Sequence, residues 1–223
     1  MSASLPPILD VIALAFQAGD AILRIYGQDF SVDHKDDQSP LTEADLASHR
    51  VITEGLRRLT PDIPVMSEES ATIPWEERRQ WQRFWLVDPL DGTKEFVKRN
   101  GEFTVNIALV EAHHPVVGVV HVPVTGVTYF GEPDMGAFRQ TGDQRPEPIH
   151  VTATLKGTPR VVGSRSHAGE GLKRFLENLG NHAFSPGGKP RIPIAVISDF
   201  CIAGNIVRNF TPLYPFKFKT GIF

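Results

Sequence analysis

Asp88-Pro-Leu-Asp-Gly-Thr93 follows directly on the apolar run Phe84–Val87, which predicts a β-strand that ends in a proline-containing turn. Such a turn places both aspartates at the rim of a sheet, where a ligand can approach. The two carboxylates repel each other unless a hard divalent cation with oxygen ligands neutralises them. The backbone N–H groups of Gly92 and Thr93 are then free to hold a phosphate. The stretch predicts a cation site beside a phosphate cradle, with a plain turn as an equally weighted alternative.

Two further acidic segments also lie next to predicted elements. Glu68-Glu69 follows the apolar run Ile63–Met66, which predicts a short strand, and Asp45 lies in the first turn of a helix that we expect Thr42 to cap. Taken singly, the glutamate pair is more often a solvated turn and Asp45 more often serves the helix end. Together with the two aspartates described above, these acids favour a shared metal site.

The spacing of the two aspartates distinguishes between two kinds of phosphatase. Enzymes that form a covalent aspartyl-phosphate carry two aspartates separated by a single residue. In this chain two residues separate Asp88 from Asp91. The spacing therefore disfavours an aspartyl nucleophile and favours attack by water that a bound metal activates.

The remaining pattern predicts a layered α+β fold, with two helices, a strand-rich meander and a further strand and helix. Pro146 and Pro148 are expected to mark a boundary, so we divide the chain into an N-terminal α+β lobe of residues 1–150 and a partial C-terminal α/β lobe of residues 151–223. The expected helices are Ile8 to about Gly27, the segment opened by Thr42, the exposed Trp75–Arg83 and Leu172–Leu179, and the expected strands include a hairpin of Thr104–Val110 with Val116–Val122, then Val127–Phe130, Gly136–Arg139 and Arg160–Gly163.

The composition excludes several functional classes. The 223 residues carry a formal net charge of -3, which argues against binding of a nucleic-acid polymer. The apolar N-terminal segment contains Asp10 and is too short for a membrane span. Cys201 is the single cysteine, so the chain cannot form an internal disulfide. We expect a cytoplasmic protein, with peripheral attachment to the inner membrane as an alternative, and leave its oligomeric state open.

Several segments together resemble the inositol-monophosphatase superfamily, and within it the bacterial 3′(2′),5′-bisphosphate nucleotidase branch. The likeness runs from about residue 8 to about residue 182, and the family fold is a layered αβαβα sandwich. The matching segments are Asp36–Asp45, Met66-Ser-Glu-Glu-Ser70, Trp85-Leu-Val-Asp-Pro-Leu-Asp-Gly-Thr-Lys-Glu-Phe96, Asn100-Gly-Glu-Phe-Thr-Val-Asn106 and Gly163-Ser-Arg-Ser-His167.

The resemblance implies a site with two or more Mg²⁺ ions. Glu68, Asp88 and the Leu90 carbonyl would bind one ion, and Asp88 would share a second with Asp91. Thr93 and Glu68 would orient the attacking water. Asp45 would support that network.

The implied substrate is 3′-phosphoadenosine 5′-phosphate, a small phosphorylated nucleotide that would yield AMP and phosphate. His167 would face the nucleotide, although a lone histidine after Ser-Arg-Ser is more often a surface residue. The residues implied in substrate binding are Glu68, Leu90, Asp91, Gly92, Thr93 and His167.

The C-terminal region departs from the family pattern. After about residue 184 we find no family-like sequence, and the Trp-Asp pair whose aspartate would complete the second metal site does not occur. We expect a truncation or frameshift that leaves the second lobe incomplete, which resequencing of this region tests, and we expect low or absent activity. Two other functions stay open: an inositol or sugar monophosphatase, and a catalytically impaired remnant that binds cations or nucleotide.

Overall fold

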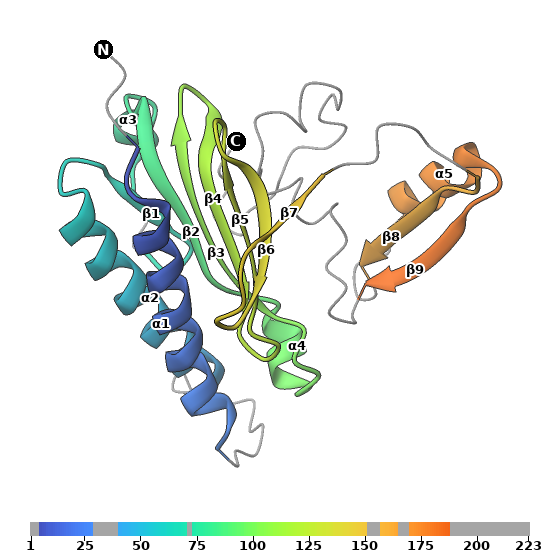
Figure 1. The fold of residues 1–223 in the computed structure, drawn as a ribbon, viewed down its shortest axis with the longest axis horizontal. Helices are drawn as coiled ribbons and strands as arrows, with labels where there is room; N and C mark the ends of the chain where they lie inside the picture. Colours follow the sequence, from blue (N-terminus) through green and yellow to red (C-terminus); the bar gives the residue numbers. More distant parts are fainter. Residues whose placement is uncertain (1–4, 29–39, 71–72, 151–156, 165–169, 188–223) are drawn as a thin grey trace.

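The computed structural model describes residues 5–28, 40–70, 73–150, 157–164 and 170–187. A seven-stranded sheet forms the main body, and its strands lie in the order in which they occur along the chain (Figure 1). The first two strands are parallel and all later neighbours are antiparallel. The strands are β1 Val65–Ser67, β2 Arg83–Asp91, β3 Thr104–Glu111, β4 His114–Val122, β5 Val127–Glu132, β6 Gly136–Thr141 and β7 Glu147–Ile149.

Two long helices, α1 Ile8–Tyr26 and α2 Pro40–Leu59, cover one face of this sheet (Figure 1). Helix α1 contacts β3, β4 and β5, whereas α2 contacts β1 and β2, and the two helices pack against each other. Apolar side chains at three- and four-residue steps on both helices meet the apolar side chains of the sheet. This layer is the main core, and its fully buried members include Val11, Ile22, Ile52, Leu56, Trp85, Ile107 and Leu109.

The predicted α+β class is confirmed, and several elements lie where we expected them. Helix α1 begins at Ile8 and ends one residue before Gly27. The predicted hairpin is β3 with β4, and its two-residue turn places Ala112 and His113 at positive φ of 47° and 66°. Such values fit a turn whose twist matches that of the paired strands.

The start of α2 corrects the expectation for Thr42. The helix begins at Pro40, so Thr42 lies inside the first turn instead of capping it. Proline suits the first helical position because its fixed φ is already helical and its missing N–H has no partner to lose there.

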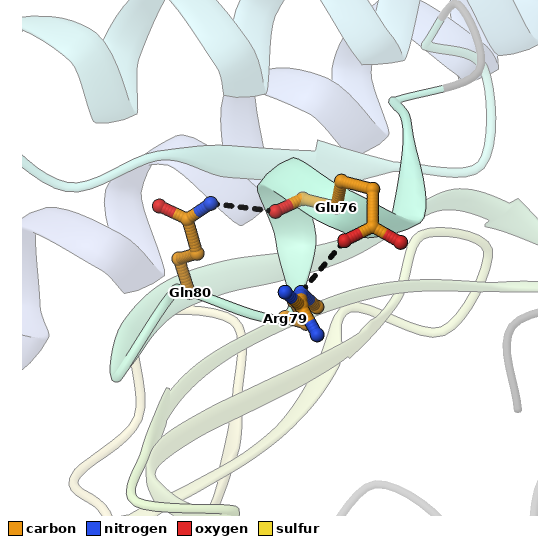
Figure 2. Close-up of polar contacts among 3 residues, drawn as sticks. All are labelled: Glu76, Arg79 and Gln80. Carbon is orange, nitrogen blue, oxygen red and sulfur yellow. Dashed lines mark hydrogen bonds and ion pairs between the residues drawn. The ribbon is translucent and has the colours of Figure 1, made fainter.

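The segment Trp75–Arg83, which we expected to be helical throughout, forms only a single helical turn. Helix α3 spans Trp75–Arg78. Just after it, Arg79 Nε lies 2.8 Å from Glu76 Oε2, and Gln80 Nε2 donates to the Glu76 carbonyl at 2.8 Å (Figure 2). These exposed contacts hold the turn, and the chain then enters β2 at Arg83. They contribute little stability because solvent screens them.

Pro148, which we expected to mark a boundary, lies in a strand. It occupies the middle of β7, opposite Phe138. Strand β7 is at the edge of the sheet, and proline is tolerated on an edge strand because its missing N–H breaks no ladder on the open side.

A second, two-stranded sheet follows in the chain. Strands β8 Arg160–Ser164 and β9 Ala183–Gly187 are parallel, and α5 Glu170–Leu179 connects them. The predicted strand and helix of this unit are confirmed, whereas β9 was not predicted. No helix in the described part of the chain is long and apolar enough to cross a membrane.

Candidate functional site

The parallel pairing of β1 with β2 brings two acidic segments to the same rim of the sheet. Ser67 lies opposite Val87, and the Glu68 N–H donates to the Val87 carbonyl at 3.1 Å. Because parallel strands end at the same edge, Glu68 comes next to Asp88. The pairing of the two strands therefore places Glu68 beside Asp88, as we predicted.

The segment from Asp88 to Asp91 continues strand β2, whereas we expected a turn there. Asp88 lies opposite Asn106 and Asp91 opposite Thr104, so three steps along β2 match two steps along β3. One extra residue in β2 makes this a β-bulge. Residues directly opposite each other share a face of the sheet, and Asn106 and Thr104 share theirs. The bulge therefore returns Asp91 to the face that Asp88 occupies.

Asp88 is a buried carboxylate among other carboxylates. Its side chain is 8% exposed. Burial, together with the nearby charges of Asp91, Glu68 and Asp45, raises the pKa of Asp88 to about 9, and a backbone hydrogen bond from Leu90 opposes the change. A group in this position resists ionisation at neutral pH unless a cation compensates its charge.

Two hydrogen-bond donors hold the second carboxylate of the site, that of Asp91. Asn106 Nδ2 donates to Asp91 Oδ2 at 3.5 Å, and the Gly92 N–H also bonds to the Asp91 side chain. Desolvation by the surrounding protein raises the pKa of Asp91; the hydrogen bond from Asn106 lowers it, and the charge of Glu95 adds to the rise. Asp91 thus has two fixed donors while its outer side reaches solvent.

The residues present fit a hard divalent cation. Asp88 Oδ1 is fully buried and has no hydrogen-bond partner among the residues that the structure describes. A buried acceptor without a partner is costly, and carboxylate oxygens are the ligands that Mg²⁺ and Ca²⁺ prefer. As the side chains stand, no group of three acidic, histidine or cysteine residues in the described ranges is close enough to hold an ion jointly. The charges of Asp91, Glu68 and Asp45 nevertheless all act on Asp88.

The backbone beyond Asp91 packs closely against the segment that precedes β3. Gly92 has a φ of 100°, and a Cβ there would lie 2.9 Å from the Glu102 carbonyl oxygen. Only glycine avoids both this strain and the contact. Helix α4, Thr93–Val97, begins directly afterwards. Because Gly92 N–H bonds to the Asp91 carboxylate, a phosphate bound here would share that donor with Asp91.

Helix α2 contributes Asp45 and two contacts that sequence reasoning missed. Asp45 is 9% exposed and lies close enough to raise the pKa of Asp88. Ser48 Oγ donates to the Pro89 carbonyl at 2.7 Å, and His49 Nδ1 lies 2.8 Å from Ser67 Oγ. Their spacing of three and four residues after Asp45 was the available signal, because such residues share one helix face.

Asn106 is the third missed residue, and it lies at the end of a segment that carries the family likeness. His167 falls outside the described residues. The structure thus brings together Asp45, Glu68, Asp88 and Asp91 at one rim, with Leu90, Gly92 and Thr93 on the adjoining backbone.

Comparison with known proteins places the chain in a family. The sequence model of the inositol monophosphatase family matches residues 6–207. The chain belongs to the inositol monophosphatase family. The match ends at residue 207, beyond the position near residue 184 where we expected family-like sequence to stop.

Relatives in this family include proteins named 3′(2′),5′-bisphosphate nucleotidase CysQ. The one from Salmonella typhimurium is 50% identical over 174 residues, which cover 77% of this chain and 69% of the relative. The one from Escherichia coli K12 is 49% identical over the same shares of the two chains. The crystal structure of CysQ from Bacteroides thetaiotaomicron superposes with a TM-score of 0.70 at 37% identity, covering 79% of this chain and 70% of that one.

Proposed function

We propose that this protein is a Mg²⁺-dependent phosphomonoesterase that removes the 3′-phosphate of 3′-phosphoadenosine 5′-phosphate, giving AMP and phosphate. Relatives named as bisphosphate nucleotidases match most of the chain at about half identity, which supports the reaction class. The match of the inositol monophosphatase family supports the same class.

The observation that carries the proposal is the crowding of carboxylates around buried Asp88. Three acidic side chains raise the pKa of this group, and one of its oxygens has no hydrogen-bond partner among the described residues. A fold that needed only stability would place an apolar or paired residue here, because unpaired buried charge is expensive. The arrangement is suited to a ligand that brings positive charge.

We assign the ion ligands accordingly. Glu68, Asp88 and the Leu90 carbonyl would hold one Mg²⁺, and Asp88 with Asp91 would hold a second. When bound, the ions supply Lewis-acid polarisation of the phosphate and a lowered pKa for water. The full burial of the Leu90 side chain fixes its backbone in the bulge, and the hydrogen bond from Asn106 fixes Asp91.

The remaining residues would bind, orient and exchange a proton. The Thr93 hydroxyl can donate to one oxygen and accept from another, so it can pass a proton from the attacking water towards Glu68. Asp45 would hold Thr93 in the accepting orientation. The N–H groups of Gly92 and Thr93 would contact the phosphate, and His167 would contact the nucleotide.

We also propose a cytoplasmic location. The single cysteine, Cys201, cannot form an internal disulfide, so nothing in the sequence calls for an oxidising compartment.

Phosphate release from matched substrates tests the proposal. The 223-residue chain is incubated with 3′-phosphoadenosine 5′-phosphate or with inositol monophosphate, each with Mg²⁺ and with a chelator. We expect Mg²⁺-dependent release that is faster with the adenosine bisphosphate, whatever the absolute rate. Faster release from inositol monophosphate would contradict the substrate, and Mg²⁺ binding without release would favour the catalytically impaired remnant.

A further inference from the structure

One face of α2 contacts both acidic segments of the rim. Asp45, Ser48 and His49 lie three and four residues apart and therefore share this face. Ser48 is fully buried and donates to the Pro89 carbonyl within the β2 bulge. His49 reaches Ser67, the last residue of β1, with Nδ1 2.8 Å from Ser67 Oγ. The helix thus joins the segment that carries Asp88 to the segment that precedes Glu68.

The contact between His49 and Ser67 lies at the end of β1, directly before Glu68 and Glu69. Ser67 is 7% exposed and is paired with Val87, so its own backbone is already fixed. The Glu68 N–H is held by the Val87 carbonyl. A side-chain anchor on Ser67 therefore sets the direction in which the chain leaves the strand.

The two glutamates after Ser67 face different neighbours. The charge of Glu68 acts on Asp88, where it raises the pKa. Burial lowers the pKa of His49 below its ordinary value; the charge of Glu69 opposes this change, and the charges of Arg57 and Arg50 add to it. The charge of Glu68 thus acts on the carboxylates, and that of Glu69 acts on the helix residue His49. A neutral imidazole can anchor the Ser67 hydroxyl without adding charge beside the acidic site.

We propose that His49 is a positioning residue: by hydrogen bonding to Ser67 it anchors the end of β1 to α2, and so directs Glu68 towards Asp88 for a shared cation. This inference rests on the proposed function and deepens it, because it names the group that orients a metal ligand without touching the metal. Residues that orient ligands in this way commonly contribute about 10–100-fold in metal affinity.

The first test measures Mg²⁺ affinity by titration calorimetry on the full chain. His49→Ala is expected to bind Mg²⁺ about tenfold more weakly than wild type, and Ser67→Ala by a similar factor. Because the two residues act through one contact, the double variant should bind no more weakly than either single one. His49→Asn places an amide atom near the position of Nδ1 and should recover most of the affinity.

A matched control separates positioning from general destabilisation. Trp85 Nε1 donates to Thr60 Oγ1 at 2.8 Å, a part-buried contact between β2 and the residue that follows α2. Thr60→Val removes this hydrogen bond and the one from Thr60 Oγ1 to the Leu56 carbonyl, and it keeps the shape of the side chain. It should lower the stability of the fold and leave Mg²⁺ affinity unchanged.

The second test follows the backbone directly in the metal-free protein. Hydrogen exchange at the Glu68 amide should become faster in His49→Ala and Ser67→Ala, and should stay as in wild type in His49→Asn and Thr60→Val. Circular dichroism establishes that each variant is folded; where His49→Ala does not fold, Ser67→Ala and His49→Asn carry the comparison.

The outcomes distinguish the two proposals. A folded wild-type chain that binds no Mg²⁺ overturns the proposed function and, with it, this inference. Wild-type binding combined with unchanged Mg²⁺ affinity and unchanged Glu68 exchange in His49→Ala overturns the role of His49 alone. A loss of affinity in Thr60→Val equal to that in His49→Ala also overturns it, because the effect would then follow stability.

Discussion

Trp85 and Asp88 lie three residues apart on the same strand, yet the fold treats their polar groups in opposite ways. Trp85 is fully buried, and its indole N–H donates to Thr60 Oγ1. Asp88 is almost as buried, but one of its oxygens has no partner in the described part of the chain, and three acids lie near it. The hydrogen-bonded Trp85 side chain stabilises the core, whereas the unpaired Asp88 oxygen destabilises the metal-free fold until a cation binds.

This difference means that stability and ligand binding depend on different ends of β2. Packing around Trp85 should determine whether the chain folds. Electrostatics around Asp88 should determine what the folded chain binds. A substitution at one end should leave the property that depends on the other end unchanged.

The largest expected effect is on stability, at the Trp85 end. Trp85→Ala removes a fully buried aromatic side chain and leaves a cavity, so the free energy of unfolding should fall by about 3–5 kcal/mol. Urea denaturation of the metal-free protein measures this loss. Thr60→Val removes the hydrogen bonds of the Thr60 hydroxyl with Trp85 and the Leu56 carbonyl but keeps the packing, and should cost about 1–2 kcal/mol. Equal losses in the two variants would contradict the importance of packing here.

The next effect is on metal binding, at the Asp88 end. Asp88→Asn removes the carboxylate that both proposed ion sites share, so Mg²⁺ affinity and phosphate release should fall by about 100-fold or more. Asp134→Asn makes the same chemical change in the exposed turn between β5 and β6 and should leave both quantities unchanged. If Asp88→Asn bound Mg²⁺ as tightly as wild type, metal binding would not depend on the Asp88 end of β2.

Acid should weaken the core through His121, a polar group that the core satisfies. His121 Nδ1 lies 2.9 Å from Thr128 Oγ1, and its ring packs edge-on against Phe16. Burial lowers the pKa of His121 to about 4 from an ordinary 6.5, although nearby Asp20 opposes the change. The folded state binds the proton less well than the unfolded state, so this contribution is complete above pH 6.5 and is lost as the pH falls towards 4.

The expected size of that loss is about 3 kcal/mol. Denaturation of wild type and His121→Asn between neutral pH and pH 4 measures it, because the difference between the two should shrink as the pH falls. His114→Asn changes an exposed histidine and should follow wild type throughout. A constant difference between wild type and His121→Asn would show that His121 has the same pKa in the folded and unfolded states.

The smallest expected effect has the opposite sign. The pKa of Asp88 is raised on folding, so the folded state binds this proton more tightly than the unfolded state does. The resulting contribution to the free energy of unfolding is fully present below the ordinary pKa of 3.8 and is lost as the pH rises towards 9. At pH 7–8 without metal, Asp88→Asn should therefore stabilise the fold by about 1–2 kcal/mol. Urea denaturation in the presence of a chelator measures this gain. A loss of stability in Asp88→Asn would show that its charge is already compensated by the protein.

Sequence patterns predicted those helices and strands that are determined by residues close together in the sequence. Helix α1 was predicted in full because its apolar residues recur with the helical period, and the β3–β4 hairpin because two β-branched runs enclose a short turn. The β2 bulge and β7 depend on pairing with distant residues. Nothing in Asp88-Pro-Leu-Asp91 itself shows that Asn106 and Thr104 will lie opposite, so the segment looked like a turn.

The acids of the site could be predicted because carboxylates near strand ends suggest metal chemistry by their type alone. Ser48 and His49 could not be found in that way, since both contact backbone or side chains far away in the sequence. Their helical spacing from Asp45 is visible in the sequence, but its meaning requires knowing that α2 lies against β1 and β2. Which polar residues orient the ligands of a site depends on tertiary contacts and not on residue type alone.

Anomalous diffraction from crystals grown with Mn²⁺ tests the central claim most directly, because Mn²⁺ takes the same oxygen ligands as Mg²⁺ and its position can be located. We expect a peak about 2.1 Å from carboxylate oxygens of both Glu68 and Asp88, next to the β2 bulge. A peak elsewhere, or none at the rim while Glu68 points away from Asp88, would contradict the account.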